Sequence, residues 1–262
     1  MRKIILSLLI FLISSQLACA EKSQPLIKEQ GVPVLLYHHI LRKDENKKFK
    51  NNTGVITPEA FARQMKILHD NGYRTVTLRE LEQFIHEEIT LPPKCVIITF
   101  DDGYLSNFKY AYPILKKYQY KAALFPITSS IRKQPEVFNP DKLNYVSWPE
   151  LLPYSDVFEY AGHTDGFHRM IGTRSFLLAK RPEDVLIDLE LSRMLLNTNY
   201  FAYPFGQYDK NTIRLLKEAG YTMAFTTRPG KVRPGTPSFE IPRYGILSTT
   251  TTRQFKNMVG IK

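Results

Sequence analysis

The amino-acid sequence predicts an α/β fold in which alternating strands and helices form one irregular (β/α) barrel. The chain has 262 residues, which suits a single domain with a full hydrophobic core. Apolar runs typical of buried strands alternate with helical patterns, which favours a mainly parallel sheet. Clusters of polar residues directly follow several of these runs. We therefore favour a barrel over an open doubly wound sheet, because a barrel gathers its strand ends at one mouth.

The expected strands are short apolar runs that contain many β-branched residues. The run Cys95–Phe100 is the clearest, because an uninterrupted apolar stretch is typical of a strand that is buried on both faces. In chain order the expected strands are 32–37, 74–77, 95–100, 121–127, 157–161, 200–203 and 222–226, followed by an extended segment at 239–246.

Capping residues mark where the expected helices begin. Thr57 followed by Pro58 opens one helix, which Gly72 ends. Thr77 and Glu80 form a capping box that opens the next one. Further helices are expected at 104–118 (disturbed at Pro113), from 148 onward, and at 182–197, 209–219 and 250–259, with a polar loop at 39–56 and an irregular segment at 128–146.

Composition and charge narrow the class of protein. Charged residues make up 23% of the chain and aromatic residues 12%, which excludes a disordered chain. Two cysteines exclude a disulfide-stapled miniprotein and a Cys-rich zinc module. The formal net charge is +11, but no nucleic-acid recognition motif accompanies it. The expected partner of this charge is an anionic cell-envelope surface rather than nucleic acid.

The first residues of the chain are typical of a secretory signal. Arg2 and Lys3 precede a short apolar stretch, and an A-x-A site ends at Ala20. The stretch is too short for a polytopic membrane protein, although an uncleaved anchor or lipid attachment at Cys19 stays open. The protein is expected to be exported, to the periplasm or the cell exterior. The expected organisation is a signal at 1–20, a linker at 21–31 and a folded domain at 32–262.

Two adjacent carboxylates end the clearest strand. Asp101 and Asp102 should point in different directions, because successive strand side chains alternate. One can bind a metal ion while the other stays free to accept a proton. The alternative is an ordinary Asp-Asp-Gly turn.

Two histidines follow a later strand at a spacing that suits a loop. His163 and His168 are five residues apart with Gly166 between them, so they do not share one helical face. A loop that folds back could bring both imidazoles to one ion. One carboxylate with two imidazoles makes an open metal site that suits Zn²⁺, and the donor types also suit Fe²⁺, Co²⁺ or Ni²⁺.

The sequence resembles the polysaccharide deacetylases, the carbohydrate esterases with a nodulation-deacetylase-type domain. Thr99-Phe100-Asp101-Asp102-Gly103 is similar to their T-F-D-D-G signature, the segment from His163 to His168 is similar to their two-histidine metal motif, and Tyr203-Pro204-Phe205-Gly206 follows a strand as expected. The resemblance covers roughly residues 32–250. It implies a distorted (β/α)₇ barrel and a metal-dependent hydrolase that removes N-acetyl or O-acetyl groups from polysaccharides.

The resemblance also implies roles for individual residues. Asp101 would be the general base, and Asp102, His163 and His168 would bind the metal. The backbone N–H near Phe205, in the segment with Tyr203 and Pro204, would hold the oxyanion.

The sequence departs from the common pattern of the family in three ways. Its two metal-motif histidines are five residues apart instead of four, the usual arginine falls on Ala202, and no histidine follows His168. These departures resemble the branch of exported poly-N-acetylglucosamine deacetylases, in which the acid histidine comes from the first strand. The acid is therefore placed on His38, with His39 as the second choice. Arg243 is a candidate to orient Asp101, and a plain surface arginine is the alternative.

The resulting hypothesis is removal of N-acetyl groups from an N-acetylglucosamine-containing envelope polysaccharide, with release of acetate. The alternatives are an O-acetyl esterase, a glycosidase with paired carboxylates and a non-catalytic glycan-binding homologue. Glycan-export machinery is a further expected partner. The rings of Tyr37, Trp148, Tyr203 and Phe205 could form a floor for a sugar ring, although core packing is the simpler interpretation for Trp148.

Overall fold

The computed structural model describes residues 31–262. The expected signal at 1–20, its cleavage or lipidation site and most of the expected linker lie outside the described residues. Among residues 31–262, no helix combines the length and apolar character that crossing a bilayer requires.

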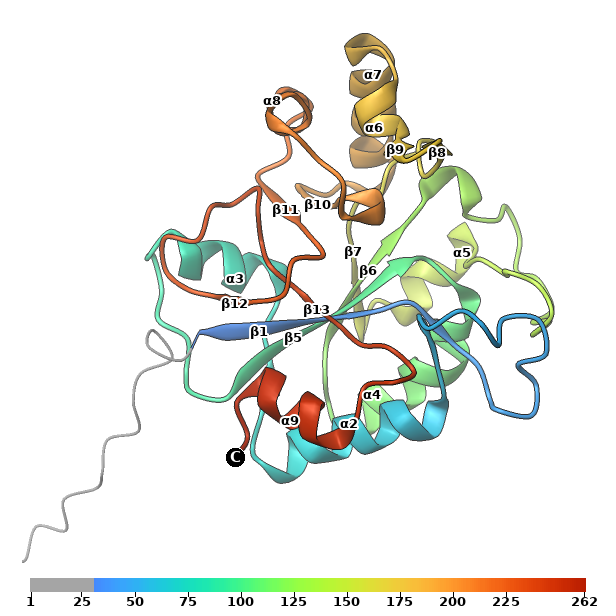
Figure 1. Ribbon diagram of the computed structural model, residues 1–262, viewed down its shortest axis with the longest axis vertical. Helices are drawn as coiled ribbons and strands as arrows, with labels where there is room; N and C mark the ends of the chain where they lie inside the picture. Colours follow the sequence, from blue (N-terminus) through green and yellow to red (C-terminus); the bar gives the residue numbers. More distant parts are fainter. Residues whose placement is uncertain (1–30) are drawn as a thin grey trace, which may run out of the picture.

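Four parallel strands form the continuous part of the barrel. They lie in the order β1, β5, β6, β7, and each pairs in parallel with the next (Figure 1). Their bounds are Val32–Tyr37 for β1, Cys95–Asp102 for β5, Ala122–Pro126 for β6 and Phe158–Tyr160 for β7. The α/β fold with a parallel sheet that the sequence predicts is confirmed.

Three further parallel strands complete the distorted barrel. Strand β10 (Tyr200–Ala202) pairs with β11 (Met223–Phe225), and β13 (Tyr244–Gly245) pairs with β1. Single-residue parallel bridges connect these pieces, one between Gly162 and Phe201 and one between Phe225 and Ile241. Continuous ladders do not close the barrel, and these two bridges are its seams.

Alternation along the strands divides the core into an inside and an outside. Val34, Ile97 and Phe125 face one apolar cluster. Their strand neighbours Leu35, Ile98 and Leu124 face a second cluster beneath the outer helices. The strands on the other side of the barrel contribute Ala202, Met223, Phe225 and Ile241 to the first cluster. The first cluster is the barrel interior.

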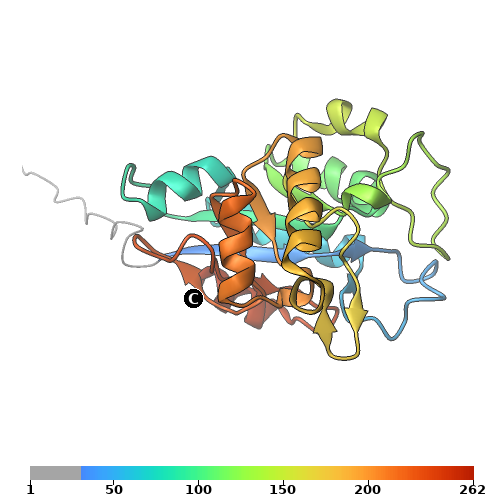
Figure 2. The same ribbon diagram turned by 90° about the horizontal axis from the view of Figure 1, so that it is seen from above.

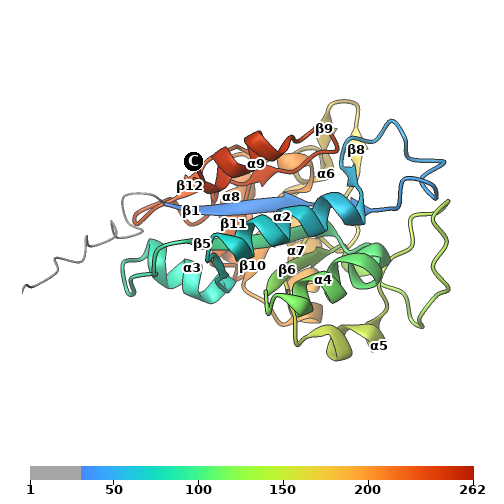
Figure 3. The same ribbon diagram turned by 90° about the horizontal axis from the view of Figure 1, so that it is seen from below.

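Helices cover the outer faces of the strands. Helices α2, α4 and α9 pack together on one side, where α2 crosses β1 and β5 (Figure 3), and α7 packs beside α8 on another (Figure 2). The helices are α2 Pro58–Asp70, α3 Leu78–Ile85, α4 Tyr112–Lys117, α5 Trp148–Leu151, α6 Phe176–Ala179, α7 Pro182–Leu196, α8 Lys210–Glu218 and α9 Thr252–Val259, with 3-10 turns η2 Thr128–Ser130, η3 Leu152–Tyr154 and η4 Pro204–Gly206.

The predicted helix starts are confirmed by their caps. Thr57 accepts a hydrogen bond from the backbone N–H of Ala60, and Thr77 with Glu80 forms the expected capping box. These caps satisfy N–H groups that the first helical turn leaves unpaired.

The structure differs from the expected elements in several places. Strand β5 continues through Asp102, so both carboxylates belong to it. The expected helix at 104–118 begins with a π-helical turn at Asn107–Ala111, just before Pro113, which cannot donate a backbone hydrogen bond. Missed elements are β2 His39–Ile40, β3 Val55–Ile56, the antiparallel β12 Lys231–Val232 on β1 and the hairpin β8 Met170–Ile171 with β9 Arg174–Ser175; β4 is shorter than expected, at Arg74–Thr75.

Candidate active site

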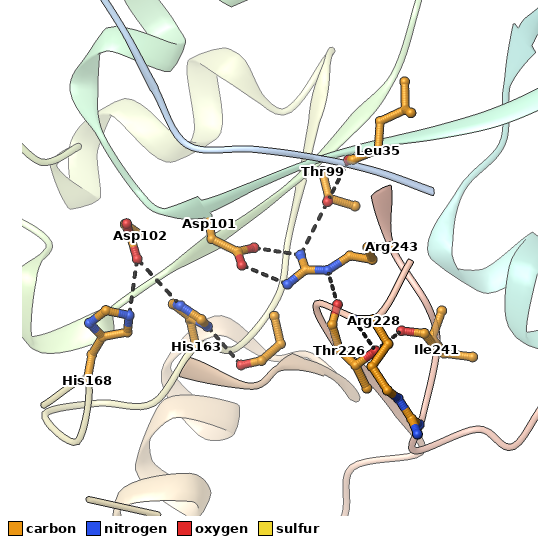
Figure 4. A network of polar contacts seen from close by, with 11 residues as sticks. Leu35, Thr99, Asp101, Asp102, His163, His168, Thr226, Arg228, Ile241 and Arg243 are labelled. Carbon is orange, nitrogen blue, oxygen red and sulfur yellow. Dashed lines mark hydrogen bonds and ion pairs between the residues drawn. The ribbon is translucent and has the colours of Figure 1, made fainter. Parts of the chain in front are cut away.

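The two carboxylates of β5 face different groups. Figure 4 shows Asp101 pointing to Arg243 and Asp102 pointing to His163 and His168. Asp102 has a φ of +72°, in the left-handed region that non-glycine residues seldom adopt. This backbone turn directs the second carboxylate away from the barrel interior.

Asp102, His163 and His168 form a cluster of potential metal ligands. One donor atom from each lies within 4.8 Å of the others. The Nε2 atoms of His163 and His168 are 3.5 and 3.3 Å from Asp102 Oδ1. His163 directly follows the strand end at β7, whereas His168 reaches the cluster from the far end of the loop. The structure thus brings together all three residues that the sequence assigns to a metal.

The hydrogen bond of His163 fixes which of its nitrogens faces the cluster. Its Nδ1 is 2.7 Å from the backbone oxygen of Ala202. A carbonyl only accepts, so Nδ1 carries a hydrogen and Nε2 is the nitrogen that faces Asp102. Burial lowers the pKa of His163, but Asp101 and Asp102 together raise it above its usual value. A proton on Nε2 can therefore bridge the 3.5 Å to Asp102 Oδ1, and a divalent cation would take the place of that proton. The donor set therefore fits a divalent metal, with the outer hydrogen bond typical of metal-bound histidine.

The ionisation of the cluster also favours a cation. Burial opposes the charged form of Asp102, but the hydrogen bond and charge of His163, with His38 and His168 nearby, hold the pKa of Asp102 well below its usual value. Burial and the neighbouring His163 lower the pKa of His168 to about 4. At neutral pH the site therefore combines an ionised Asp102 with a neutral His168, the forms that bind metals, and metal binding would release the proton that the raised pKa of His163 retains.

Asp101 forms a bidentate ion pair inside the barrel. Both its oxygens accept hydrogen bonds from the guanidinium of Arg243 at 2.7 Å. The Arg243 side chain is fully buried (0% exposed), so it is not a surface arginine. Its Nε donates to the backbone oxygen of Thr226, and the Thr99 hydroxyl lies 3.3 Å from its Nη1. The arginine is held from three sides and fixes the plane of the Asp101 carboxylate.

The charges around Asp101 keep it ionised. Burial raises the pKa of Asp101, whereas Arg243, His163 and, at longer range, His38 lower it below its usual value. An ionised carboxylate beside the metal-ligand cluster can accept a proton at neutral pH.

The two histidines at the end of β1 have different surroundings. His39 is buried, its Nδ1 is 2.6 Å from the Ser106 hydroxyl, and burial lowers its pKa to about 4. His38 is only partly buried, and its backbone oxygen accepts a hydrogen bond from the Asn107 side chain. Of the two, His38 is the one that solvent reaches and that contributes to the potential at both Asp101 and Asp102.

The segment from Tyr203 to Gly206 presents one aromatic ring to the site. Phe205 is 46% exposed, has a φ of +58° and places its ring 4.4 Å from the His168 ring. Tyr203 is fully buried and donates its hydroxyl to the backbone oxygen of Phe239, while Pro204 is also buried.

The expected aromatic floor is wrong for two of its members. The rings of Tyr37 and Tyr203 are wholly inside the core, where Tyr37 donates its hydroxyl to the Gln64 side chain, so neither can stack on a sugar. Trp148 is partly buried and packs against the core cluster beneath the outer helices.

Sequence reasoning missed a pair of stacked tyrosines next to the metal cluster. Tyr104 and Tyr145 lie with ring centroids 5.5 Å apart. Burial and the charge of Asp102 raise the pKa of both hydroxyls, so each stays protonated at neutral pH. Tyr104 follows the Asp-Asp-Gly segment directly, and this position in the sequence indicates that it lies near the site. Tyr145 lies in the irregular segment 128–146, where no periodicity marks it.

Comparisons with known proteins agree with this geometry. A sequence model described as polysaccharide deacetylase matches residues 88–145. The Bacillus subtilis protein YxkH, whose name places it among the polysaccharide deacetylases, is 31% identical over 209 residues, which cover 78% of this chain and 67% of YxkH. The chain belongs to the polysaccharide deacetylase family. The predicted family, fold class and enzyme class are thereby confirmed, and the protein is a hydrolase that deacetylates a polysaccharide.

Other relatives of this deacetylase cover more of its length. The poly-β-1,6-N-acetyl-D-glucosamine N-deacetylase of Staphylococcus epidermidis is 28% identical over 243 residues, which are 85% of this chain and 82% of the relative. The structure of IcaB from Ammonifex degensii matches with a TM-score of 0.73 and 28% identity, over 88% of this chain and 96% of IcaB. The Streptococcus pyogenes deacetylase PplD shares the fold, with a TM-score of 0.74 and 23% identity over 87% and 98% of the two chains.

Proposed function

We propose that this deacetylase removes N-acetyl groups from a polysaccharide that contains N-acetylglucosamine, and that it requires a divalent cation, with Zn²⁺ as the first candidate. The observation that carries the proposal is an ionised, arginine-held carboxylate adjacent in sequence to the carboxylate of a two-histidine cluster. The names of the Staphylococcus epidermidis and Ammonifex relatives support the same substrate class.

Asp102, His163 and His168 would hold the cation. When bound there, a divalent metal supplies Lewis-acid chemistry, which polarises a carbonyl and acidifies water. The ligand cluster is buried at Asp102 and His163 but partly open at His168, so substrate would approach from the His168 side. Three protein ligands leave at least one position open, as hydrolytic metal sites require.

Asp101 would act as the general base. Its two oxygens accept from Arg243, and a carboxylate retains further lone pairs with which it can accept a proton from the attacking water. Arg243 is a positioning residue, because it fixes this carboxylate and keeps it charged but lies inside the barrel.

His38 would donate the proton to the departing sugar amine. It is the partly accessible histidine at the end of β1, whereas His39 is committed to Ser106. The backbone N–H of Phe205 would stabilise the oxyanion. The turn bonds next to it are donated by Gly206 and Gln207 rather than by Phe205.

The location and partners of the enzyme are part of the proposal. The signal expected at residues 1–20 would export the protein to the periplasm or the cell exterior. A formal net charge of +11 would favour contact with an anionic envelope surface or with glycan-export machinery.

The test is acetate release from poly-β-1,6-N-acetylglucosamine, chitin oligomers, peptidoglycan and O-acetylated xylan, each with and without a chelator. Chelator-sensitive release from an N-acetylated glycan is expected. Release from acetylated xylan alone would replace the proposal with an O-acetyl esterase, and unchanged release after complete metal removal would refute the metal requirement.

A further inference from the structure

Asp188 anchors the loop that carries both histidines. The residue lies on α7, outside the barrel, and is buried. Its Oδ1 accepts the backbone N–H of Asp165 at 2.9 Å, and its Oδ2 accepts that of Gly166 at 2.6 Å. One carboxylate thus binds two consecutive peptide groups between His163 and His168.

A second set of bonds, from the 3-10 turn η2, holds the same loop. The Thr128 hydroxyl donates to Asp165 Oδ1 at 2.6 Å. The backbone N–H groups of Thr128 and Ser129 donate to the backbone oxygens of Thr164 and Asp165, each at 3.1 Å. The loop is therefore clamped between η2 and α7.

The loop needs this clamp because its conformation is strained. Thr164 has a φ of +71°, which is a rare and strained conformation for a β-branched residue. The Thr164 hydroxyl is also buried without a hydrogen-bond partner. These costs persist only if the surrounding bonds hold the loop in place.

Open space beside the loop would let it relax. A surface pocket of about 450 Å³ that opens to solvent is lined by the loop residues Gly166 and Phe167 and by Ile187 and Asp188 of α7. No lysine or arginine forms an ion pair with Asp188 within residues 31–262. The hydrogen bonds of its carboxylate go to backbone N–H groups of this loop.

We propose that Asp188 is a positioning residue that sets the affinity of the metal site, by holding His163 and His168 at the separation a cation requires. The inference rests on the proposed metal site and goes beyond it, because Asp188 bonds to the loop backbone between the two histidines and not to the side chain of either one. Loss of outer partners of metal ligands weakens binding about 10–100-fold, and the same range is expected here.

The experiment compares Asp188→Asn with a matched control, Asp184→Asn. Asp184 lies one turn earlier on α7 and pairs with the exposed Arg181, so its replacement leaves the loop bonds intact. In Asp188→Asn the amide NH₂ faces a backbone N–H that formerly had an acceptor. The Zn²⁺ dissociation constant of each metal-free protein is measured by competition with a chromophoric chelator, and the absorption spectrum of the Co²⁺ form reports ligand geometry.

The expected result is a 10–100-fold weaker Zn²⁺ affinity and an altered Co²⁺ spectrum for Asp188→Asn alone, with kcat recovering at saturating Zn²⁺. A folded Asp188→Asn protein with an affinity within twofold of wild type would overturn the proposal. If that variant fails to fold, Asp188→Glu, which keeps the charge but displaces it, serves in its place with the same criterion. A wild-type protein that binds no Zn²⁺ would instead refute the proposed metal site.

Discussion

Two acidic side chains face the inside of the barrel, and they are stabilised in opposite ways. Asp101, near the carboxyl end of β5, pairs with Arg243, and its pKa falls below the usual value despite burial. Glu159, on β7, pairs with no arginine or lysine among the described residues. It accepts the backbone N–H of Leu78 at the start of α3, and burial raises its pKa to about 7.

The two environments differ in how much positive charge they supply to the carboxylate. A helix N-terminus supplies partial positive charge and one N–H, which accommodates an acid without keeping it fully ionised. A buried guanidinium supplies a full charge and two matched donors. Only the second arrangement provides a base that is charged at neutral pH.

The largest effect should follow from removing the charge of Asp101. Asp101→Asn is expected to lower kcat about 10²–10⁴-fold, because the amide cannot accept the proton. Zn²⁺ stoichiometry should stay at the wild-type value, since the metal ligands are intact. Acetate release and metal analysis on the folded protein check both halves, with Asp156→Asn on the surface as the matched substitution. Turnover within tenfold of wild type would remove Asp101 as the base.

Removing Arg243, the ion-pair partner of Asp101, should lower the unfolding free energy more than any surface substitution. Arg243→Met leaves Asp101 as an uncompensated buried charge, which costs about 3–5 kcal/mol of unfolding free energy. Arg228→Met, which breaks an exposed pair with Glu240 at 2.9 Å and an exposed cation–π contact with Tyr208, should cost about 1 kcal/mol or less. Urea unfolding at neutral pH measures both values. Equal losses of unfolding free energy in the two variants would contradict the expected difference between a buried and an exposed ion pair.

Replacing Glu159 should have a smaller effect on stability, and that effect should depend on pH. Its folded pKa of about 7 exceeds the ordinary 4.5, so the folded state holds a proton that the unfolded state has lost between these values. Stability therefore falls as pH rises from about 4.5 to 7 through this group. Glu159→Gln should stabilise the protein by about 1–3 kcal/mol at pH 8 and by much less at pH 5.

Unfolding free energies of Glu159→Gln and wild type at the two pH values test this, with the exposed Glu88→Gln as a pH control. A stabilisation that does not change between pH 5 and pH 8 would show that burial does not raise the pKa of Glu159.

The smallest effect concerns the helix end that Glu159 contacts. Thr77→Ala removes the side-chain acceptor for the Glu80 backbone N–H at the start of α3, at a cost of about 0.5–2 kcal/mol. Thermal unfolding measures it. A loss above this range would mean that Thr77 and Glu159 stabilise the helix end jointly rather than separately.

Much of the site could be predicted because local signals mark it. The Asp-Asp pair ends an apolar run, and the polar residues after the strands share one edge of the barrel in the way that parallel strands require. The helix caps at Thr57 and Thr77 depend only on neighbouring residues. Such features need no knowledge of tertiary structure.

Other features depend on how distant segments meet. Glu159 lies on a strand of three residues, too short to show alternation, so its inward direction could not be predicted. The Asp188 carboxylate lies on a helix that carries apolar residues on its exposed face as well, including Ile187 and Met194. Its contact with the loop exists only because α7 packs against the barrel there.

The bridge between Gly162 and Phe201 couples cation binding at the proposed metal site to closure of the barrel. His163 directly follows this bridge, and its Nδ1 bonds to Ala202 across the same seam. A cation that binds only when the seam is closed must stabilise the closed form in proportion to its concentration. Amide hydrogens along β10 should consequently exchange with solvent more slowly in the loaded enzyme, and by a larger factor than those of β1, which carries no ligand of the proposed site.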